Sequence, residues 1–173
     1  MRTTNKKSGF SLIEIVIYTA ILAALSLFVA NTTLLSFNSL NRARLNRKVA
    51  LSAETALERL TREIKLASSI NEAQSVLGTN PSTVVLNTVV SAEDITPASK
   101  IFSVSGGQIT LQENGGEIKF LTAPGITVSS FTASGIDLLH SQAIKINLVI
   151  ESGGGSIRTS KTFYASAVLR ESY

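Results

Sequence analysis

The acidic residue Glu14 stands alone in the most apolar stretch of the chain. It is the only charged residue between Phe10 and Asn41, and it is the fifth residue of that stretch. Moving an ionised carboxylate into lipid costs about 2.5–3.5 kcal/mol at the centre of a membrane helix, and less near the interface. A carboxylate in such a place needs an oppositely charged partner, because a buried charge is tolerated when an opposite charge pairs with it.

The other residues capable of chemistry do not form a catalytic pattern. His140 is the only histidine and Asp137 lies three residues before it, but no nucleophile motif stands near them. We therefore interpret the two as a polar pair at a strand or loop end. Glu93, Asp94 and Asp137 lack the spacing of a calcium loop, and the chain has no cysteine for a disulfide, a thiolate nucleophile or a cysteine-type zinc site. The sequence predicts no enzyme activity, no metal site and no cofactor.

Residues 10–30 have the length and composition of a transmembrane helix. As an α-helix these 21 residues would span about 31 Å, which matches the hydrocarbon core of a bilayer. Three bases precede the run, and they favour a cytoplasmic N-terminus: Arg2, Lys6 and Lys7. We therefore predict a single-pass protein of the cytoplasmic (inner) membrane.

An apolar segment can have one of three common roles, but each of them fails to explain some feature of residues 10–30. A secretory signal peptide has a shorter apolar region and a small-residue cleavage site after it, whereas Gly9 lies before this run. A plain signal anchor accounts for the length but for neither Gly9 nor Glu14. A buried core helix does not need leading bases. Cleavage before the run accounts for these features together.

The formal net charge of +4 does not indicate a nucleic-acid partner, because the excess is local. Three of the 16 Lys and Arg residues lie in the first nine positions, which leaves 13 against 12 Asp and Glu. A second basic cluster lies beyond the apolar run, and we interpret it as a solvated helix face: Arg42, Arg44, Arg47 and Lys48. No feature of the sequence firmly indicates binding to nucleic acid.

The heptapeptide Ser8-Gly9-Phe10-Ser11-Leu12-Ile13-Glu14 resembles the processing site of type IV prepilins and of the pseudopilins of type II secretion. In that family a short basic leader ends in glycine. A membrane aspartyl protease, the prepilin peptidase, cuts after this glycine and N-methylates the new first residue, usually Phe. The fifth mature residue is usually Glu. The resemblance implies removal of the leader 1–9, cleavage and N-methylation at Gly9 and Phe10, and a role in subunit assembly for Glu14.

The same resemblance implies partners and a location. Subunits of the family stack with their apolar helices at the centre of a filament, where Glu14 would meet the Phe10 amine of a neighbouring subunit and set the register between subunits. The implied partners are the prepilin peptidase, other pilin or pseudopilin subunits, the membrane and the filament assembly platform. The chain would pass from the membrane into a cell-surface or periplasmic filament. Asn31 departs from the family pattern, in which proline is common at that position, so a kink there is not implied.

Residues 31–70 continue the helical pattern with a change of character. Apolar residues recur at spacings of three and four, which predicts a stripe on one face: Leu45, Val49, Ala53, Ala56, Leu57, Leu60, Ile64 and Ala67. The opposite face is charged, with Glu58 and Arg62 spaced as an i,i+4 ion pair: Glu54, Glu58, Arg59, Arg62, Glu63 and Lys65. We predict one helix over residues 10–70. Two helices broken near residues 38–41 are the alternative.

From residue 71 the composition becomes that of a β domain. Ten of the eleven Gly and all three Pro lie from residue 78 onward, with short alternating runs between them. Asn114-Gly115-Gly116 predicts a hairpin, and the glycines at 153–155 predict a turn, since they lack the Gly-Lys-Ser/Thr of a phosphate loop. Tight turns between successive strands predict an antiparallel sheet covered by the helix stripe. The predicted strands are residues 83–90, 100–105, 108–113, 117–121, 126–131, 136–139, 143–151 and 157–169.

The sequence thus predicts an α+β, type IV pilin-like fold, with a long N-terminal α-helix packed on a C-terminal antiparallel β-sheet over residues 71–173. The expected function is that of a minor pilin or pseudopilin in a type IV pilus or a type II secretion pseudopilus. Residues 57–67 and 163–170 resemble, more loosely, the helix end and last strand of W-type minor pilins and J-type minor pseudopilins. The alternative is a membrane-anchored surface module that binds DNA or polysaccharide and does not polymerise.

Overall fold

The computed structural model describes residues 9, 11–89, 96–138, 141–154 and 157–169. The chain divides into two compact units, Met1–Asn41 and Arg42–Tyr173. The first unit contains the beginning of the helix α1. The second contains the rest of this helix and all of the described strands, and the two units are described separately.

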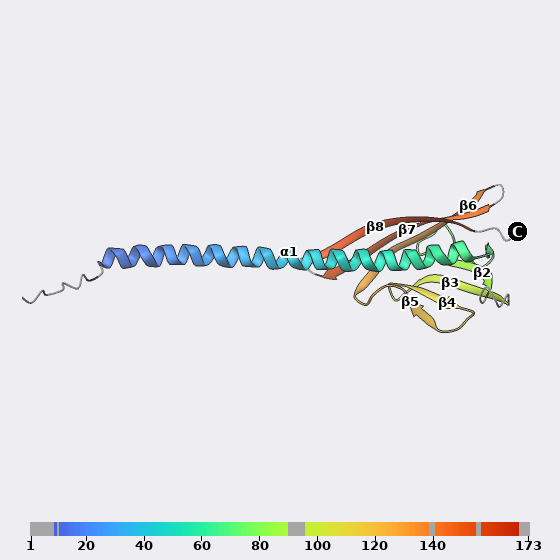
Figure 1. Ribbon diagram of the computed structural model, residues 1–173, viewed down its shortest axis with the longest axis horizontal. Helices are drawn as coiled ribbons and strands as arrows, with labels where there is room; N and C mark the ends of the chain where they lie inside the picture. Colours follow the sequence, from blue (N-terminus) through green and yellow to red (C-terminus); the bar gives the residue numbers. More distant parts are fainter. Residues whose placement is uncertain (1–8, 10, 90–95, 139–140, 155–156, 170–173) are drawn as a thin grey trace, which may run out of the picture. The chain divides into compact units, whose positions relative to one another are not determined.

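Helix α1 runs without interruption from Leu12 to Leu66 (Figure 1). This confirms the prediction of one long helix, and the alternative of a break near residues 38–41 is wrong. The helix contains no Gly and no Pro, the two residues that fit a helix interior least well. It ends four residues before the predicted position.

In the first unit, α1 presents apolar side chains on all sides. The large apolar residues between Leu12 and Leu40 are 50–81% exposed. The helix is long and apolar enough to cross a membrane, in agreement with the transmembrane segment predicted at residues 10–30. An apolar surface of this extent is stable only where lipid or another protein surface covers it.

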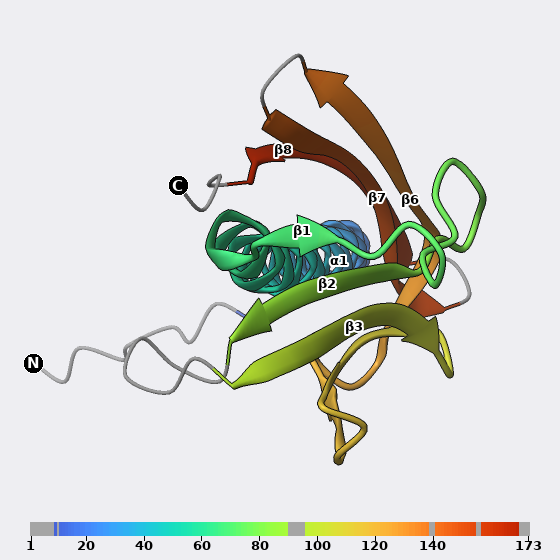
Figure 2. The ribbon, with the colours of Figure 1, turned by 90° about the vertical axis from the view of Figure 1, so that its right-hand side faces the viewer.

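The second unit contains two antiparallel sheets where the sequence predicted one. Five strands follow chain order in the first sheet: β1 (Ser69–Ile70), β2 (Val84–Val89), β3 (Pro97–Ser105), β4 (Gln108–Glu113) and β5 (Ile118–Phe120). The second sheet has three strands with β7 in the middle: β6 (Ile126–Leu138), β7 (Ser141–Gly154) and β8 (Ile157–Val168). Figure 2, a view along α1, shows the helix between the β6–β8 sheet and strands β2 and β3.

Two tight turns join strands of the first sheet, and the second of them was predicted correctly from Asn114-Gly115-Gly116. Gly106 and Gly107 join β3 to β4 with φ values of 58° and 74°, and Asn114 and Gly115 follow β4 with φ values of 50° and 68°. Positive φ at both central residues matches the right-handed twist of the paired strands, and Asn and Gly adopt it at least cost. The amide of Gly116 donates to the carbonyl oxygen of Glu113 at 2.8 Å and closes the second turn.

Three boundaries differ from the prediction. The strands predicted at 126–131 and 136–139 form one strand, β6, with a register shift between Val128 and Ser130. Ala133 and Gly135 are of types that are depleted in strands, yet all of residues 132–135 pair with β7. Gly153 and Gly154, predicted as part of a turn, are the last paired residues of β7. Strand β1 lies where the helix was predicted to end.

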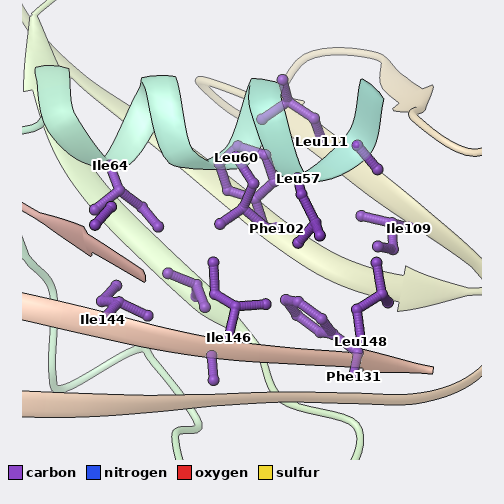
Figure 3. Packing of buried hydrophobic residues seen from close by; sticks show 14 of the residues in the cluster. Leu57, Leu60, Ile64, Phe102, Ile109, Leu111, Phe131, Ile144, Ile146 and Leu148 are labelled. Carbon is purple, nitrogen blue, oxygen red and sulfur yellow. The ribbon is translucent and has the colours of Figure 1, made fainter. Parts of the chain in front are cut away.

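One apolar core holds the second unit together (Figure 3). The predicted stripe of α1 is confirmed, because its members from Val49 to Ala67 are 0–8% exposed. Both sheets contribute fully buried partners: Phe102, Ile109 and Leu111 from the first, and Phe131, Ile144, Ile146 and Leu148 from the second. Truncating a buried Leu or Ile to Ala in such a core costs about 2–5 kcal/mol, so the stripe is the element on which both sheets depend.

Glu63 corrects the predicted charged face of α1. The sequence placed it among the solvent-facing residues, but its side chain is only 4% exposed. Its Oε2 lies 2.6 Å from Nζ of Lys100 on β3, and its Oε1 lies 2.9 Å from Nε of Arg59. The i,i+4 ion pair is therefore Arg59–Glu63, and no ion pair joins Glu58 and Arg62, both of which the structure describes. Strand β3 places a cation against this turn of the helix, which sequence spacing alone does not reveal.

The same charge network reaches two further strands through Glu113, at the end of β4. The Glu113 carboxylate lies 3.4 Å from Nη2 of Arg59 and 2.7 Å from Nζ of Lys119. The hydrogen bond from Lys119 holds the pKa of Glu113 below its usual value, and the charges of Lys119, Lys100 and Arg59 act in the same direction, while burial opposes them. The network thus ties α1 to β3, β4 and β5.

A truncated chain of residues 42–173 should fold as a soluble monomer, because both sheets cover the part of the α1 stripe that it keeps. Circular dichroism and sedimentation equilibrium would test this. An unfolded or aggregated fragment would show that the apolar segment before Arg42 is needed for the second unit to fold.

The Glu63→Gln substitution should lower the free energy of unfolding of this fragment by about 1–2 kcal/mol, because Lys100 loses its charged partner in a mostly buried site. The matched control is Glu58→Gln, an exposed position five residues earlier in the same helix, which should change stability by less than about 0.5 kcal/mol. Chemical denaturation measures both. Equal effects of the two substitutions would show that the Glu63 pair does not stabilise the contact between helix and sheet.

Candidate functional site

The segment around the start of α1 carries the residues that the sequence singled out. Gly9 is exposed, and among the described residues no atom lies within 4 Å of the position that a Cβ would take there. The helix begins two residues after Phe10, and the carbonyl oxygen of Ser11 accepts hydrogen bonds from the amides of Glu14 at 3.0 Å and Ile15 at 3.3 Å. The peptide bond after Gly9 therefore precedes the hydrogen-bonded turn. The leader residues 1–8 and Phe10 lie outside the described residues.

Glu14 lies in the first turn of α1, and its side chain is half-buried. The phenolic hydroxyl of Tyr18 donates a hydrogen bond to Oε1 of Glu14 at 3.0 Å. The two residues are four apart, the spacing at which side chains meet on one helix face. The positive end of the helix dipole also favours an acid in the first turn. Sequence reasoning missed Tyr18, although its spacing from Glu14 was the signal that could have found it.

No cation lies within ion-pair distance of Glu14 among the residues that the structure describes. Its carboxylate contrasts with that of Glu63, which two cations contact farther along the same helix. A Tyr hydroxyl satisfies part of the hydrogen-bonding capacity of a carboxylate, but it does not neutralise the charge. The site thus presents a carboxylate on an apolar surface, with no cation beside it in the part of the chain that the structure describes.

Other polar side chains of the apolar segment bond to their own helix. Four hydroxyls donate to backbone carbonyl oxygens three or four residues earlier, at 2.8–3.0 Å: Thr19, Ser26, Thr32 and Thr33. Such bonds let Ser and Thr enter lipid without an external partner. Glu14 cannot be satisfied in this way, because a carboxylate accepts hydrogen bonds and the helix carbonyls offer none.

The other polar residues that the sequence analysis considered do not form a site in the described structure. Glu93, Asp94 and His140 lie outside the described residues, and the structure gives the backbone of Asp137 in β6 but not the surroundings of its side chain. Among the described residues, no group of three or more His, Cys, Asp or Glu side chains is arranged to hold a metal ion. The start of α1 is therefore the candidate functional site.

The fold and this site define a class of protein. A long N-terminal helix packed against antiparallel sheets is an α+β architecture of the type IV pilin kind. Residues 4–30 match the family model described as the prokaryotic N-terminal methylation motif. The chain thus carries a type IV prepilin-like class III signal peptide on a membrane-anchored, single-pass protein. Comparison with curated proteins and with solved structures finds no match.

Proposed function

We propose that this chain is a minor pilin or pseudopilin, a structural subunit of a type IV pilus or of a type II secretion pseudopilus. In this proposal the prepilin peptidase cuts after Gly9, Phe10 becomes the N-methylated first residue, and the subunit moves from the membrane into a filament. The observation that carries the proposal is the single carboxylate of Glu14, which has no cation beside it in the described structure and lies five residues after Gly9, within the segment that matches the methylation motif.

Cleavage would create the partner that Glu14 needs. A new amine at Phe10 is a positive charge at the head of an apolar helix, and in a filament core it would be as costly to bury alone as the carboxylate. Pairing the amine of one subunit with Glu14 of the next removes both costs. Since the surrounding apolar helices can slide past one another at little cost, this pair would fix their register, as single buried polar residues do in coiled coils.

The length of the apolar surface supports assembly over simple anchoring. From Leu12 to Leu40 the helix rises about 43 Å, whereas a bilayer core is about 30 Å thick, and a typical tilt of about 20° removes only about 3 Å of the excess. Four large apolar side chains near the end of this stretch are 54–69% exposed: Leu34, Leu35, Phe37 and Leu40. A lipid anchor does not need them, but a helix that packs among other helices does.

The orientation and partners follow from the same proposal. The leader bases favour a cytoplasmic N-terminus, where the peptidase would act, and the second unit would then lie across the membrane from the leader. Other pilins or pseudopilins and the assembly platform are the partners. The alternative, a membrane-anchored module that binds DNA or polysaccharide without polymerising, needs neither cleavage after Gly9 nor a carboxylate at position 14. Tight binding of duplex DNA by residues 42–173 at physiological salt would favour that alternative.

Gly9→Leu should leave the leader attached, because a bulky side chain at the cut obstructs the peptidase. A leucine side chain at position 9 would contact no atom of the described structure outside its chain neighbours. A loss of cleavage would therefore show that the peptidase does not accept the variant, and would not result from misfolding. Gly9→Ala adds only one methyl group, so the peptidase should cut this variant more completely than Gly9→Leu. Mass analysis of the N-terminus, with and without a prepilin peptidase, distinguishes the precursor from a chain that starts at methylated Phe10. Normal cleavage of Gly9→Leu would remove the basis of the proposal.

Glu14→Leu should insert into the membrane and be cut normally, because it makes the segment more apolar and leaves the leader intact. It should fail to enter the filament efficiently, since a neighbour's amine would then be buried unpaired, a loss of about 3–5 kcal/mol. Glu14→Asp has a shorter reach and should fall between Glu14→Leu and the wild type. The measurement is the amount of the subunit in sheared filaments relative to the membrane. Unchanged incorporation of Glu14→Leu would contradict the assembly role.

A further inference from the structure

We propose that Tyr18 is a positioning residue for subunit assembly, because its hydroxyl holds the Glu14 carboxylate in the orientation that receives the neighbouring amine. This inference rests on the proposed function and assigns a second residue to the same site. It concerns the stage before assembly, when Glu14 lies in the membrane and its cationic partner has not yet arrived.

The geometry carries the proposal. The Tyr18 hydroxyl lies 3.0 Å from Oε1 of Glu14, on the same face and one turn farther along α1. A hydrogen bond to an ionised carboxylate is stronger than one between neutral groups, and water is scarce where the segment enters lipid. Tyr18 therefore supplies, from the same chain, a donor that water would otherwise provide.

The hydrogen bond from Tyr18 leaves the Glu14 carboxylate able to bind a second partner. A carboxylate has two oxygens and about four lone-pair sites, and the Tyr18 hydroxyl uses one site on Oε1. The bond also selects among the side-chain rotamers of Glu14, so that less conformational entropy remains to be lost when the amine arrives. The partner then meets an oriented acceptor.

Tyrosine suits this place better than a shorter hydroxyl residue. The hydroxyls of Thr19 and Ser26 are taken by helix carbonyls, as is usual when a short polar side chain lies in an apolar helix. The Tyr ring is too long to bond back to its own turn, and it is apolar enough to remain in lipid while its hydroxyl reaches Glu14. The four-residue spacing from Glu14 and the choice of tyrosine at position 18 thus both favour the hydrogen bond between the two side chains.

The test compares four variants of the full chain in cells that assemble the filament. Tyr18→Phe removes only the hydroxyl. Tyr18→Phe combined with Ile17→Tyr returns a hydroxyl three residues from Glu14, a spacing that also reaches it. Thr19→Val is the matched control, because it removes a neighbouring hydroxyl that bonds to Val16 instead. Glu14→Leu is the reference for loss of the site. Each variant is scored for membrane insertion, cleavage, and the ratio of subunit in filament to subunit in membrane.

Tyr18→Phe should insert and be cut normally, but its ratio of filament to membrane should fall about tenfold, the effect of one hydrogen bond to a charged group. The shifted tyrosine should restore most of that ratio, and Thr19→Val should match the wild type. A normal ratio for Tyr18→Phe beside a defective Glu14→Leu would overturn this inference and leave the proposed function standing. A defect that the shifted tyrosine does not restore would also overturn it. A normal ratio for Glu14→Leu would contradict the assembly role of Glu14, and absence of the wild-type chain from the filament would contradict the proposed function itself.

Discussion

An apolar helix surface must be covered by lipid or by protein, and this constraint shapes both units of the chain. In the second unit, one stripe of α1 is buried almost completely and the two sheets are organised around it. In the first unit the helix is apolar on every side, and its large side chains remain at least half exposed. A membrane would cover about 30 Å of this surface, and under the proposed function other helices cover the rest.

The two partly or fully buried acids of α1 show how the chain handles charge next to apolar surface. Glu63 is enclosed by its own domain, and Lys100 and Arg59 neutralise it there. Glu14 has a hydroxyl from Tyr18 within the chain, but no cation among the described residues. An unpaired buried charge is among the most destabilising features that a protein can carry, and under the proposed function the partner of Glu14 belongs to another subunit. A subunit with an amine at its own N-terminus meets that requirement.

Local patterns predicted the elements well, and long-range contacts account for what they missed. The i,i+3/i+4 spacing of apolar residues identified the buried stripe of α1, and the Asn-Gly pair identified a hairpin, because helix faces and tight turns are decided within a few residues. The burial of Glu63 depends on Lys100, 37 positions away, and no periodicity encodes that distance. The division into two sheets and the continuity of β6 across Gly135 are likewise set by tertiary pairing. At the candidate site, Gly9 and Glu14 were identified from the sequence, whereas Tyr18 was identified from its hydrogen bond to Glu14, although its spacing of four residues was a signal in the sequence.

The central claim is that the head of α1 contacts the same region of another subunit. Photo-crosslinking tests it most directly, with a photoreactive amino acid at Ile17, which shares a helix face with Glu14. In assembled filaments we expect adducts to the N-terminal helix of a second pilin or pseudopilin, and we expect Glu14→Leu to abolish them. Adducts confined to lipid, in filament material that contains the subunit, would contradict the account.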